Sequence, residues 1–386
     1  MTAPQYTLKQ IALYALKLGT FGFGGPVALV GYMYRDLVEQ RHWISEADYE
    51  EGLALAQLMP GPLAAQLAIY LGYVHYRLRG ATVVGLLFVL PSFLMVVALG
   101  WLYVRFGGLT WMQAVFYGVG ASVIGIIALS AYKLTTKNIG RDRLLWAIYL
   151  VSAAITAITS SEFVGVFVLS GLIVWLVRVR LQTPISPSTV RSVGAAALFL
   201  VPIDWPKLLQ IGTFFAKAGT FVFGSGLAIV PFLYGGVVGE HQWLTERQFV
   251  DAVAVAVAMI TPGPVVITTA FIGYLIAGLS GSIVAAVGTF LPCYLLTVIP
   301  APYFKRYGQR PAIVAFVDGA TAAAIGTITG AVVVLGRRSI TDVPTVLLAL
   351  TTAALIWKVK KLPEPVIILI AALVGLLIFS PPTLSS

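Results

Sequence analysis

The chain has 386 residues, of which 59% are hydrophobic and 10% are charged, and its mean hydropathy is +0.93. Soluble domains carry about 25% charged residues, so this composition excludes a soluble protein and predicts an all-α polytopic membrane protein. The net charge of +10 is attributed to basic cytoplasmic loops, and no nucleic acid partner is expected.

The first apolar segment contains Phe21-Gly22-Phe23-Gly24-Gly25-Pro26, and Pro60-Gly61-Pro62 follows it. Glycine costs backbone entropy in a helix and proline lacks an amide donor, so both stretches are predicted to break helices. Non-helical backbone at membrane depth survives only where it is buried in protein or faces a water-filled cavity. These breaks therefore indicate a transport site, as in carriers with discontinuous helices. The competing interpretation is that they are kinks and packing notches without a ligand.

Four apolar spans follow in the first half, and Pro91 should kink the first of them. Their residues are 81–104, 111–134, 144–159 and 163–177. A polar stretch at 182–191 joins this half to a second series, in which Pro292 takes the place of Pro91. The spans of that series are 283–299, 312–335, 343–357 and 366–379. In all, about 10–12 membrane segments are predicted from their lengths.

The broken segment occurs twice. Lys17, Thr20 and Trp43 recur 200 residues later as Lys217, Thr220 and Trp243, and Pro-Gly-Pro recurs at 262–264. Such self-similarity predicts a duplicated unit. The predicted organisation is a first repeat at 1–183, a linker at 184–204 and a second repeat at 205–386.

Loop charges predict opposite orientations for the two repeats. Arginines flank the first Pro-Gly-Pro segment on both sides, at positions 35, 41, 77 and 79, so this segment is predicted to be re-entrant from the cytoplasm. In the second half the loop at 277–281 has no basic residue, whereas 305–310 has three. The simplest model has five crossings and one re-entrant hairpin per half, so the second repeat is inverted. An alternative makes the first broken helix re-entrant too, adds a crossing at about 193–203 and places the N-terminus in the cytoplasm.

Helices that begin after a break expose unpaired amide donors and the positive end of the helix dipole, which attract anions. Lys17 and Lys217 lie inside apolar helices, each three residues before a threonine. We expect the two ammonium groups to face one cavity and to balance a dianion. The competing interpretation is that both lysines snorkel to the membrane interface.

The predicted substrate-binding residues are the two lysines, polar side chains near the breaks, glycines in the breaks, and the first donors after them. They are Lys17, Thr20, Gly24, Gly25, Gln57, Gly61, Leu63, Gln66, Lys217, Thr220, Gly224, Ser225, Thr261, Gly263, Val265 and Thr268.

A proton-coupling group would have to come from a few acids: Glu46, Glu51, Glu246, Asp251 and Asp318. For the first four, the competing interpretation is that they stabilise helix N-termini. The chain lacks a Walker A motif, so it is not expected to be driven by ATP alone. The spans hold no paired carboxylates or histidine clusters, so no enzyme activity is expected. With one cysteine and three histidines, no disulfide, metal or cofactor is expected.

These residues resemble the CHR family, the chromate ion transporters. The resemblance rests on the stretches 21–26, 57–62 and 90–91, on Trp43 with Glu46, and on Gly72, and it recurs from Thr220 through Pro292. It implies a long, two-domain member with antiparallel halves. The second copy departs from the pattern, because Ser225-Gly226 stands in place of Gly25-Pro26.

The resemblance implies secondary active transport of chromate, or of a related tetrahedral oxyanion such as sulfate, across the inner membrane of the cell. Efflux of this kind would give chromate resistance. The residues alone predict only a secondary transporter for a small anion. The alternative is an anion channel, or an exchanger for sulfate or another small anion. The lipid bilayer is the expected surrounding, and a homodimer is one assembly left open.

Overall fold

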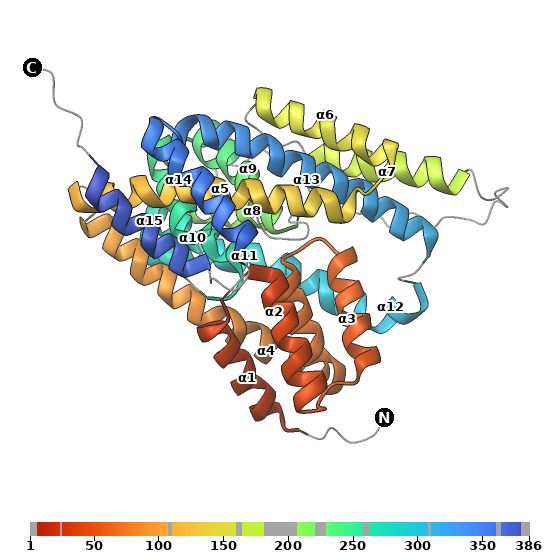
Figure 1. The fold of residues 1–386 in the computed structure, drawn as a ribbon. Coiled ribbons are helices and arrows are strands. Elements are labelled where there is room, and N and C mark those ends of the chain that lie inside the picture. The colour runs from red at the N-terminus through yellow and green to blue at the C-terminus, as the bar shows by residue number, and fades with distance from the viewer. Residues whose placement is uncertain are drawn as a thin grey trace, which may run out of the picture.

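The computed structural model describes residues 6–23, 25–106, 110–159, 164–180, 207–220, 229–257, 262–307, 310–359 and 364–379, which are helical and contain no β-strand (Figure 1). Four helices are long and apolar enough to cross a membrane: Leu63–Phe106, Gln113–Asn138, Thr268–Phe304 and Pro311–Arg337. Four shorter apolar helices accompany them, at Arg143–Thr159, Gly165–Arg178, Val343–Lys358 and Val366–Ile378. The chain is therefore an all-α polytopic membrane protein.

The first half begins with α1 (Leu8–Phe21), α2 (Gly25–Met33) and a π-helical segment, η1 (Tyr34–Gln40). Then come α3 (Glu46–Leu58) and α4 (Leu63–Phe106). The predicted breaks are confirmed, because α1 ends immediately before Gly22 and Pro60-Gly61-Pro62 separates α3 from α4. Within α4 the chain reverses at Arg77, whose φ is 51°. A Cβ placed on Gly72 would lie 2.5 Å from the Gly80 carbonyl oxygen, so the two legs of α4 pack as a close hairpin.

The first broken segment doubles back on itself. The Tyr14 hydroxyl of α1 donates to Asp36 of η1 over 3.3 Å, and the Tyr6 ring, just before α1, stacks on Trp43, just after η1. These contacts require α1 to lie antiparallel to α2 and η1 (Figure 1). The simplest model, in which this segment crosses in one direction, is wrong. In this doubling back the structure agrees with the alternative, whose additional crossing at 193–203 lies outside the described residues.

The second half repeats these elements as α8 (Lys207–Thr220), α9 (Ile229–Tyr234), η2 (Gly235–Glu240), α10 (Glu246–Val257), η3 (Val265–Ile267) and α11 (Thr268–Val298). Local details repeat as well. Thr20 and Thr220 each donate to the carbonyl four residues earlier over 2.7 Å. The chain reverses within α11 at Ala277 and Gly278, as α4 does at Arg77.

Most of the remaining helices form a bundle to which both halves contribute (Figure 1). Its elements are α5 (Thr110–Asn138), α6 (Arg143–Thr159), α7 (Val164–Arg180), α13 (Pro311–Ser339), α14 (Val343–Lys358) and α15 (Glu364–Ile378). The short helix α12 (Ala301–Tyr307) lies beside α3 instead and packs against α3 and α11 (Figure 1). Helix α5 packs mainly against α14 and α15, and α13 packs mainly against α6 and α7. Each half thus completes its bundle with helices of the other, and the predicted linker at 184–204 lies outside the described residues.

Small residues let these helices approach closely. A Cβ on Gly125 of α5 would lie 2.3 Å from the Ala349 carbonyl oxygen, and a Cβ on Gly326 of α13 would lie 2.3 Å from that of Tyr149. These two glycines are 201 residues apart and make the same kind of contact with the opposite half. Helices α5 and α13 run in opposite directions in the bundle (Figure 1).

Candidate functional site

The first helix break and the second Pro-Gly-Pro meet in space. The Gly263 amide donates to the Gly22 carbonyl oxygen over 3.0 Å, although the two residues lie in different halves of the chain. The Ser92 hydroxyl, one residue after Pro91, donates to the Pro262 carbonyl oxygen over 2.6 Å and is buried. The second Pro-Gly-Pro is therefore held by two polar contacts with the first half.

Gly263 is required at this contact. Its φ is +90°, and a Cβ would lie 2.1 Å from the Ser92 hydroxyl oxygen. Any other residue would strain the backbone and displace Ser92.

The first Pro-Gly-Pro is held within its own half. The Gln66 side-chain amide donates to the Pro60 carbonyl oxygen over 2.9 Å. Gln66 is fully buried, and its side-chain oxygen accepts no hydrogen bond from the described residues. Gly61 has φ +145°, and a Cβ there would lie 2.5 Å from the Gln66 amide nitrogen. This turn therefore packs directly on the first turn of α4.

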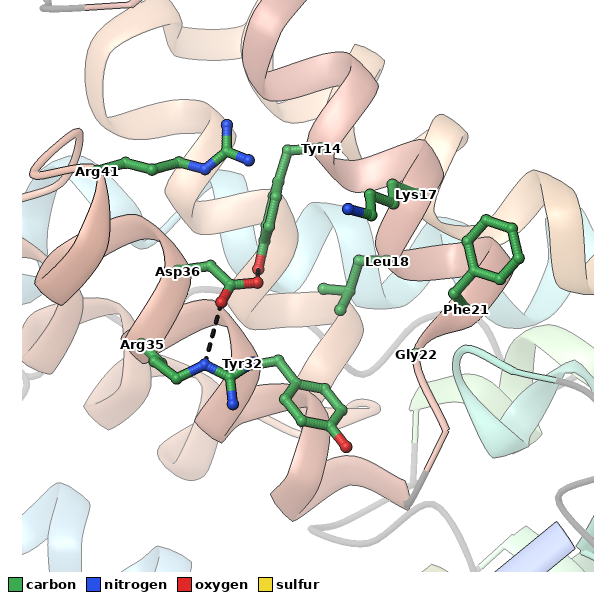
Figure 2. Close-up of a pocket in the computed structure, with 9 residues that line it drawn as sticks. All are labelled: Tyr14, Lys17, Leu18, Phe21, Gly22, Tyr32, Arg35, Asp36 and Arg41. Atoms are coloured by element: carbon green, nitrogen blue, oxygen red, sulfur yellow. Dashed lines mark hydrogen bonds and ion pairs between the residues drawn. The ribbon is translucent and has the colours of Figure 1, made fainter. Parts of the chain in front are cut away.

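A pocket of about 250 Å³ opens between α1 and the segment that doubles back on it (Figure 2). We call it the basic pocket. Its lining residues are Tyr14, Lys17, Leu18, Phe21, Gly22, Tyr32, Arg35, Asp36 and Arg41. Three cationic side chains face one carboxylate, so the lining carries a net positive charge. Gly22, whose carbonyl oxygen accepts the bond from Gly263, also lines the pocket.

The polar groups of the basic pocket differ in the hydrogen bonds, ion pairs and ring contacts that they make. Asp36 accepts from the Tyr14 hydroxyl over 3.3 Å and from Arg35 over 3.2 Å. The Arg41 guanidinium lies 4.6 Å from the centre of the Trp43 ring. Within the part of the chain that the structure describes, the Lys17 ammonium makes no hydrogen bond or ion pair (Figure 2). Arg41 makes only ring contacts, so Lys17 and Arg41 are the cations of this pocket that hold no ion pair among the described residues.

The second copy has no equivalent of this charge pattern. At the 200-residue offset Tyr14, Arg35, Asp36 and Arg41 are replaced by Phe214, Gly235, Gly236 and His241. Phe214 stacks on Phe232 with ring centres 5.3 Å apart, and His241 stacks on Trp243 at 4.3 Å. Two of these four positions are thus glycine and the other two make ring contacts, so the ion pair of the first copy is not repeated.

The structure separates the predicted binding residues into groups. Lys17 lines the basic pocket, and Gly263 contacts Gly22, which also lines it. Lys17 and Lys217 both have exposed side chains, and Lys217 does not line that pocket. Both threonine hydroxyls donate to carbonyls of their own helices.

The other predicted residues lie outside the basic pocket or outside the description. Gln57 is exposed, Leu63 is half-buried, Thr268 is buried, and Gly25 begins α2. Gly24, Gly224, Ser225 and Thr261 lie outside the described residues, as does the side chain of Val265.

Sequence reasoning missed most of the polar lining of the basic pocket. It used Arg35 and Arg41 only as markers of the cytoplasmic side and did not single out Tyr14, Tyr32 or Asp36. A signal was present, because these residues differ between two otherwise similar copies. A group that is charged in one repeat and apolar or small in the other is a candidate for function.

The candidate coupling acids differ in their surroundings. Glu46 and Glu246 are exposed and accept from Tyr34 and Tyr234 over 2.9 and 3.1 Å. Glu51 is half-buried. These three acids lie in the α3 and α10 helices, and each contacts a tyrosine of its own half.

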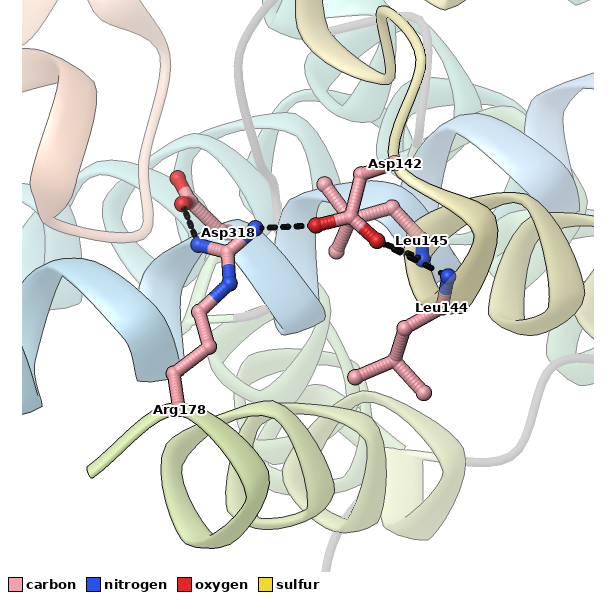
Figure 3. A network of polar contacts seen from close by, with 5 residues as sticks. All are labelled: Asp142, Leu144, Leu145, Arg178 and Asp318. Carbon is pink, nitrogen blue, oxygen red and sulfur yellow. Dashed lines mark hydrogen bonds and ion pairs between the residues drawn. The ribbon is translucent and has the colours of Figure 1, made fainter. Parts of the chain in front are cut away.

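Asp318 belongs to an ion-pair network that joins α13 to the first half (Figure 3). Arg178 of α7 donates to Asp318 over 2.5 Å and to Asp142 over 2.7 Å. The hydrogen bond from Arg178 holds the pKa of Asp142 below its usual range, and the amides of Leu144 and Leu145 add to this effect. Asp318 thus has a structural partner, whereas Asp251 is 8% exposed and makes no ion pair among the described residues.

Comparison with known proteins places the chain in a family. A model described as "Chromate transporter" matches twice, at residues 9–175 and 209–376. A chromate transport protein of Cupriavidus metallidurans is 68% identical over 382 residues, which are 98% of this chain and 95% of that protein. A probable chromate transport protein of Synechococcus elongatus is 62% identical over 383 residues, which are 98% and 97% of the two chains. No solved structure matches. The chain therefore belongs to the chromate transporter family.

Proposed function

We propose that this protein is a secondary transporter that carries chromate across the inner membrane, and that the basic pocket is its substrate site. The observation that carries the proposal is the position of Gly22. It lines the pocket, and its carbonyl oxygen accepts a hydrogen bond from Gly263 of the other half. The names of the relatives supply the substrate.

The chemistry of the pocket suits a small dianion. Removing a dianion from water costs many kcal/mol unless charges or donors in the protein replace the water. Lys17, Arg35 and Arg41 supply positive charge, and Tyr32 supplies a hydroxyl. Sulfate has the same tetrahedral shape and charge as chromate. We therefore include sulfate as a second substrate of the same site.

The transport cycle follows from the contact between the halves. The Gly263–Gly22 hydrogen bond joins the second Pro-Gly-Pro to the first helix break, and the Ser92–Pro262 hydrogen bond joins it to α4. A shift of one half against the other would break both bonds and open the pocket to the other side of the membrane. We propose an inverted-repeat carrier of this kind, a proposal supported by the opposite directions of α5 and α13 (Figure 1).

We propose that the physiological direction is efflux, which lowers cytoplasmic chromate and gives resistance. A membrane potential that is negative inside favours the exit of a dianion, by about 2.3 kcal/mol per charge for each 100 mV. Export of chromate therefore needs no ATP.

The test is chromate counterflow in proteoliposomes that contain the purified protein. Vesicles are loaded with unlabelled chromate, diluted, and given a trace of radiolabelled chromate outside. A carrier gives a transient accumulation of label above equilibrium, and loading with sulfate should support the same accumulation. Label that enters without an overshoot would identify an anion channel and contradict the proposal, as would uptake no greater than in protein-free vesicles.

A further inference from the structure

Asp251 is the one carboxylic acid that is buried among the described residues, with 8% of its surface exposed. It lies on α10, the helix that leads to the second Pro-Gly-Pro. A buried carboxylate is costly when ionised unless a cation or several donors offset the lost hydration. Its surroundings therefore decide whether it holds a charge or a proton.

Those surroundings are poor in charge. The Tyr103 hydroxyl donates to Asp251 over 2.8 Å, and Tyr103 belongs to α4 of the first half. The nearest cation is Arg247, one turn earlier on α10, which is exposed and acts on the Asp251 charge from a distance without forming an ion pair. Helices α5 and α11 contribute Phe116 and Phe271, whose rings lie 5.4 and 5.8 Å from that of Tyr103. One neutral donor from the other half is thus the direct partner of this carboxyl group among the described residues.

The equivalent acid of the first copy has a hydrogen-bond partner from its own half. Glu51 lies 200 residues before Asp251, is half-buried, and is hydrogen-bonded to Tyr70 of its own half. At an offset of 201, Tyr70 is replaced by Phe271 and Tyr103 by Phe304. Neither phenylalanine can donate a hydrogen bond. The acid of the second copy is therefore the one whose partner comes from the opposite half.

We infer that Asp251 is the proton-carrying group that couples a proton gradient to transport, an inference that rests on the proposed function. The Tyr103 hydrogen bond holds the carboxylate between the halves. Movement of the halves breaks this bond and leaves the carboxylate buried without a donor. A proton from the side then open neutralises it, and the proton is released when the bond to Tyr103 forms again. The only covalent change is the making and breaking of one carboxyl O–H bond.

The experiment compares two assays in the same proteoliposomes. Chromate counterflow measures exchange and needs no net proton movement. Accumulation of chromate under an imposed pH gradient, with the membrane potential clamped, measures coupling. The variants are Asp251→Asn, which cannot ionise, and Glu51→Gln, the matched change at the equivalent acid. Tyr103→Phe keeps the carboxyl group and removes only its donor.

The unaltered protein and Glu51→Gln should accumulate chromate under the pH gradient. Accumulation on the acidic side identifies proton antiport, on the alkaline side proton symport, and either supports the inference. Asp251→Asn should keep counterflow and lose the response to the gradient, and Tyr103→Phe should show a weakened response. Tyr103→Phe also decides the matter where Asp251→Asn does not insert into the membrane.

The inference is overturned if Asp251→Asn or Tyr103→Phe responds to the gradient as fully as the unaltered protein. It is also overturned if the unaltered protein shows counterflow and ignores the gradient. Absence of counterflow in the unaltered protein would contradict the proposed function itself. The two failures are thus separate results.

Discussion

One buried hydroxyl fastens the second Pro-Gly-Pro to the first half. Ser92→Ala would leave the Pro262 carbonyl oxygen without its donor, which should cost about 1–3 kcal/mol of stability. Ser152→Ala is the matched control, because the Ser152 hydroxyl is buried and has no hydrogen-bond partner among the described residues. Thermal unfolding in detergent should show a lower midpoint for Ser92→Ala and an unchanged or higher one for Ser152→Ala. Equal losses in both variants would show that the Ser92 bond adds nothing beyond packing.

At the scale of single residues, the sequence predicts positions that matter but not the groups they meet. Lys17 stands out because it is a charge in an apolar helix. Arg41 lies 24 residues later, in a loop, and reaches the same pocket only because the chain turns back at the break. The spacing along the chain contains no sign of that turn. Sequence reasoning therefore found one of the three cations that line the basic pocket.

At the scale of elements, glycine and proline determine where helices end but not where the chain goes next. The ends of α1 and α3 at Phe21 and Leu58 follow from Gly22 and Pro60. Whether the chain continues across the membrane or doubles back depends on packing between α1 and η1. The charge pattern is compatible with both paths, and the simpler path, a crossing in one direction, is the wrong one.

The Gly263 turn is predicted to tolerate no side chain. Gly263→Ala adds a Cβ that meets Ser92 at a positive φ, whereas Gly278→Ala adds one at φ +61° with no atom within 4 Å. Both variants bear the backbone strain of about 1–2 kcal/mol, but only the first also breaks a contact between the halves. Gly263→Ala should lose most chromate counterflow while Gly278→Ala keeps it. Similar counterflow in the two variants would show that only the positive φ of Gly263 matters and that its contact with Ser92 does not.

The ion-pair network around Arg178 predicts that Arg178→Gln is less stable than the unaltered protein by an amount that depends on pH. Because the folded-state pKa of Asp142 is lowered, its contribution is present above the usual aspartate pKa of about 4 and is lost as the pH falls through the folded value. Arg178→Gln should therefore lower the unfolding midpoint at pH 7 by an amount that shrinks towards pH 3. The pairs are partly exposed, so the effect should be at most about 1 kcal/mol.

Arg143→Gln serves as the control for this prediction, because Arg143 is an exposed neighbour of Asp142 that makes no ion pair among the described residues. It should leave the midpoint unchanged at both pH values. A deficit of Arg178→Gln that stays constant with pH would argue for lost packing rather than a lost ion pair.

At the scale of the whole molecule, composition alone predicts an all-α membrane protein, and the repeat predicts two similar halves. Neither composition nor the repeat predicts how the helices of the two halves pack against one another. Helices α5 and α13 each pack on the last two helices of the other half, through glycines such as Gly125 and Gly326. Contacts between residues about 200 positions apart leave no local periodicity in a sequence. Only the folded structure brings these residues together.

The proposed inversion predicts that the two hairpin turns lie on opposite sides of the membrane. Arg79 and Ser280 are exposed positions just after the turns of α4 and α11. In a Cys293→Ser background, Arg79→Cys should react with an impermeant maleimide only in inside-out vesicles. Ser280→Cys should react only in intact cells or right-side-out vesicles. Labelling of both from one side would exclude inverted repeats.

Equilibrium binding of radiolabelled chromate to the purified protein tests whether the basic pocket of the first copy binds the oxyanion. Lys17→Met should weaken binding more than about tenfold, or about 1.4 kcal/mol, and Lys17→Arg should weaken it less because the charge is kept. Lys9→Met removes an exposed charge from the same helix outside the pocket and should change nothing, and Lys217→Met should have a smaller effect than Lys17→Met. Unaltered chromate affinity in Lys17→Met, with the protein folded, would show that the basic pocket is not the chromate site.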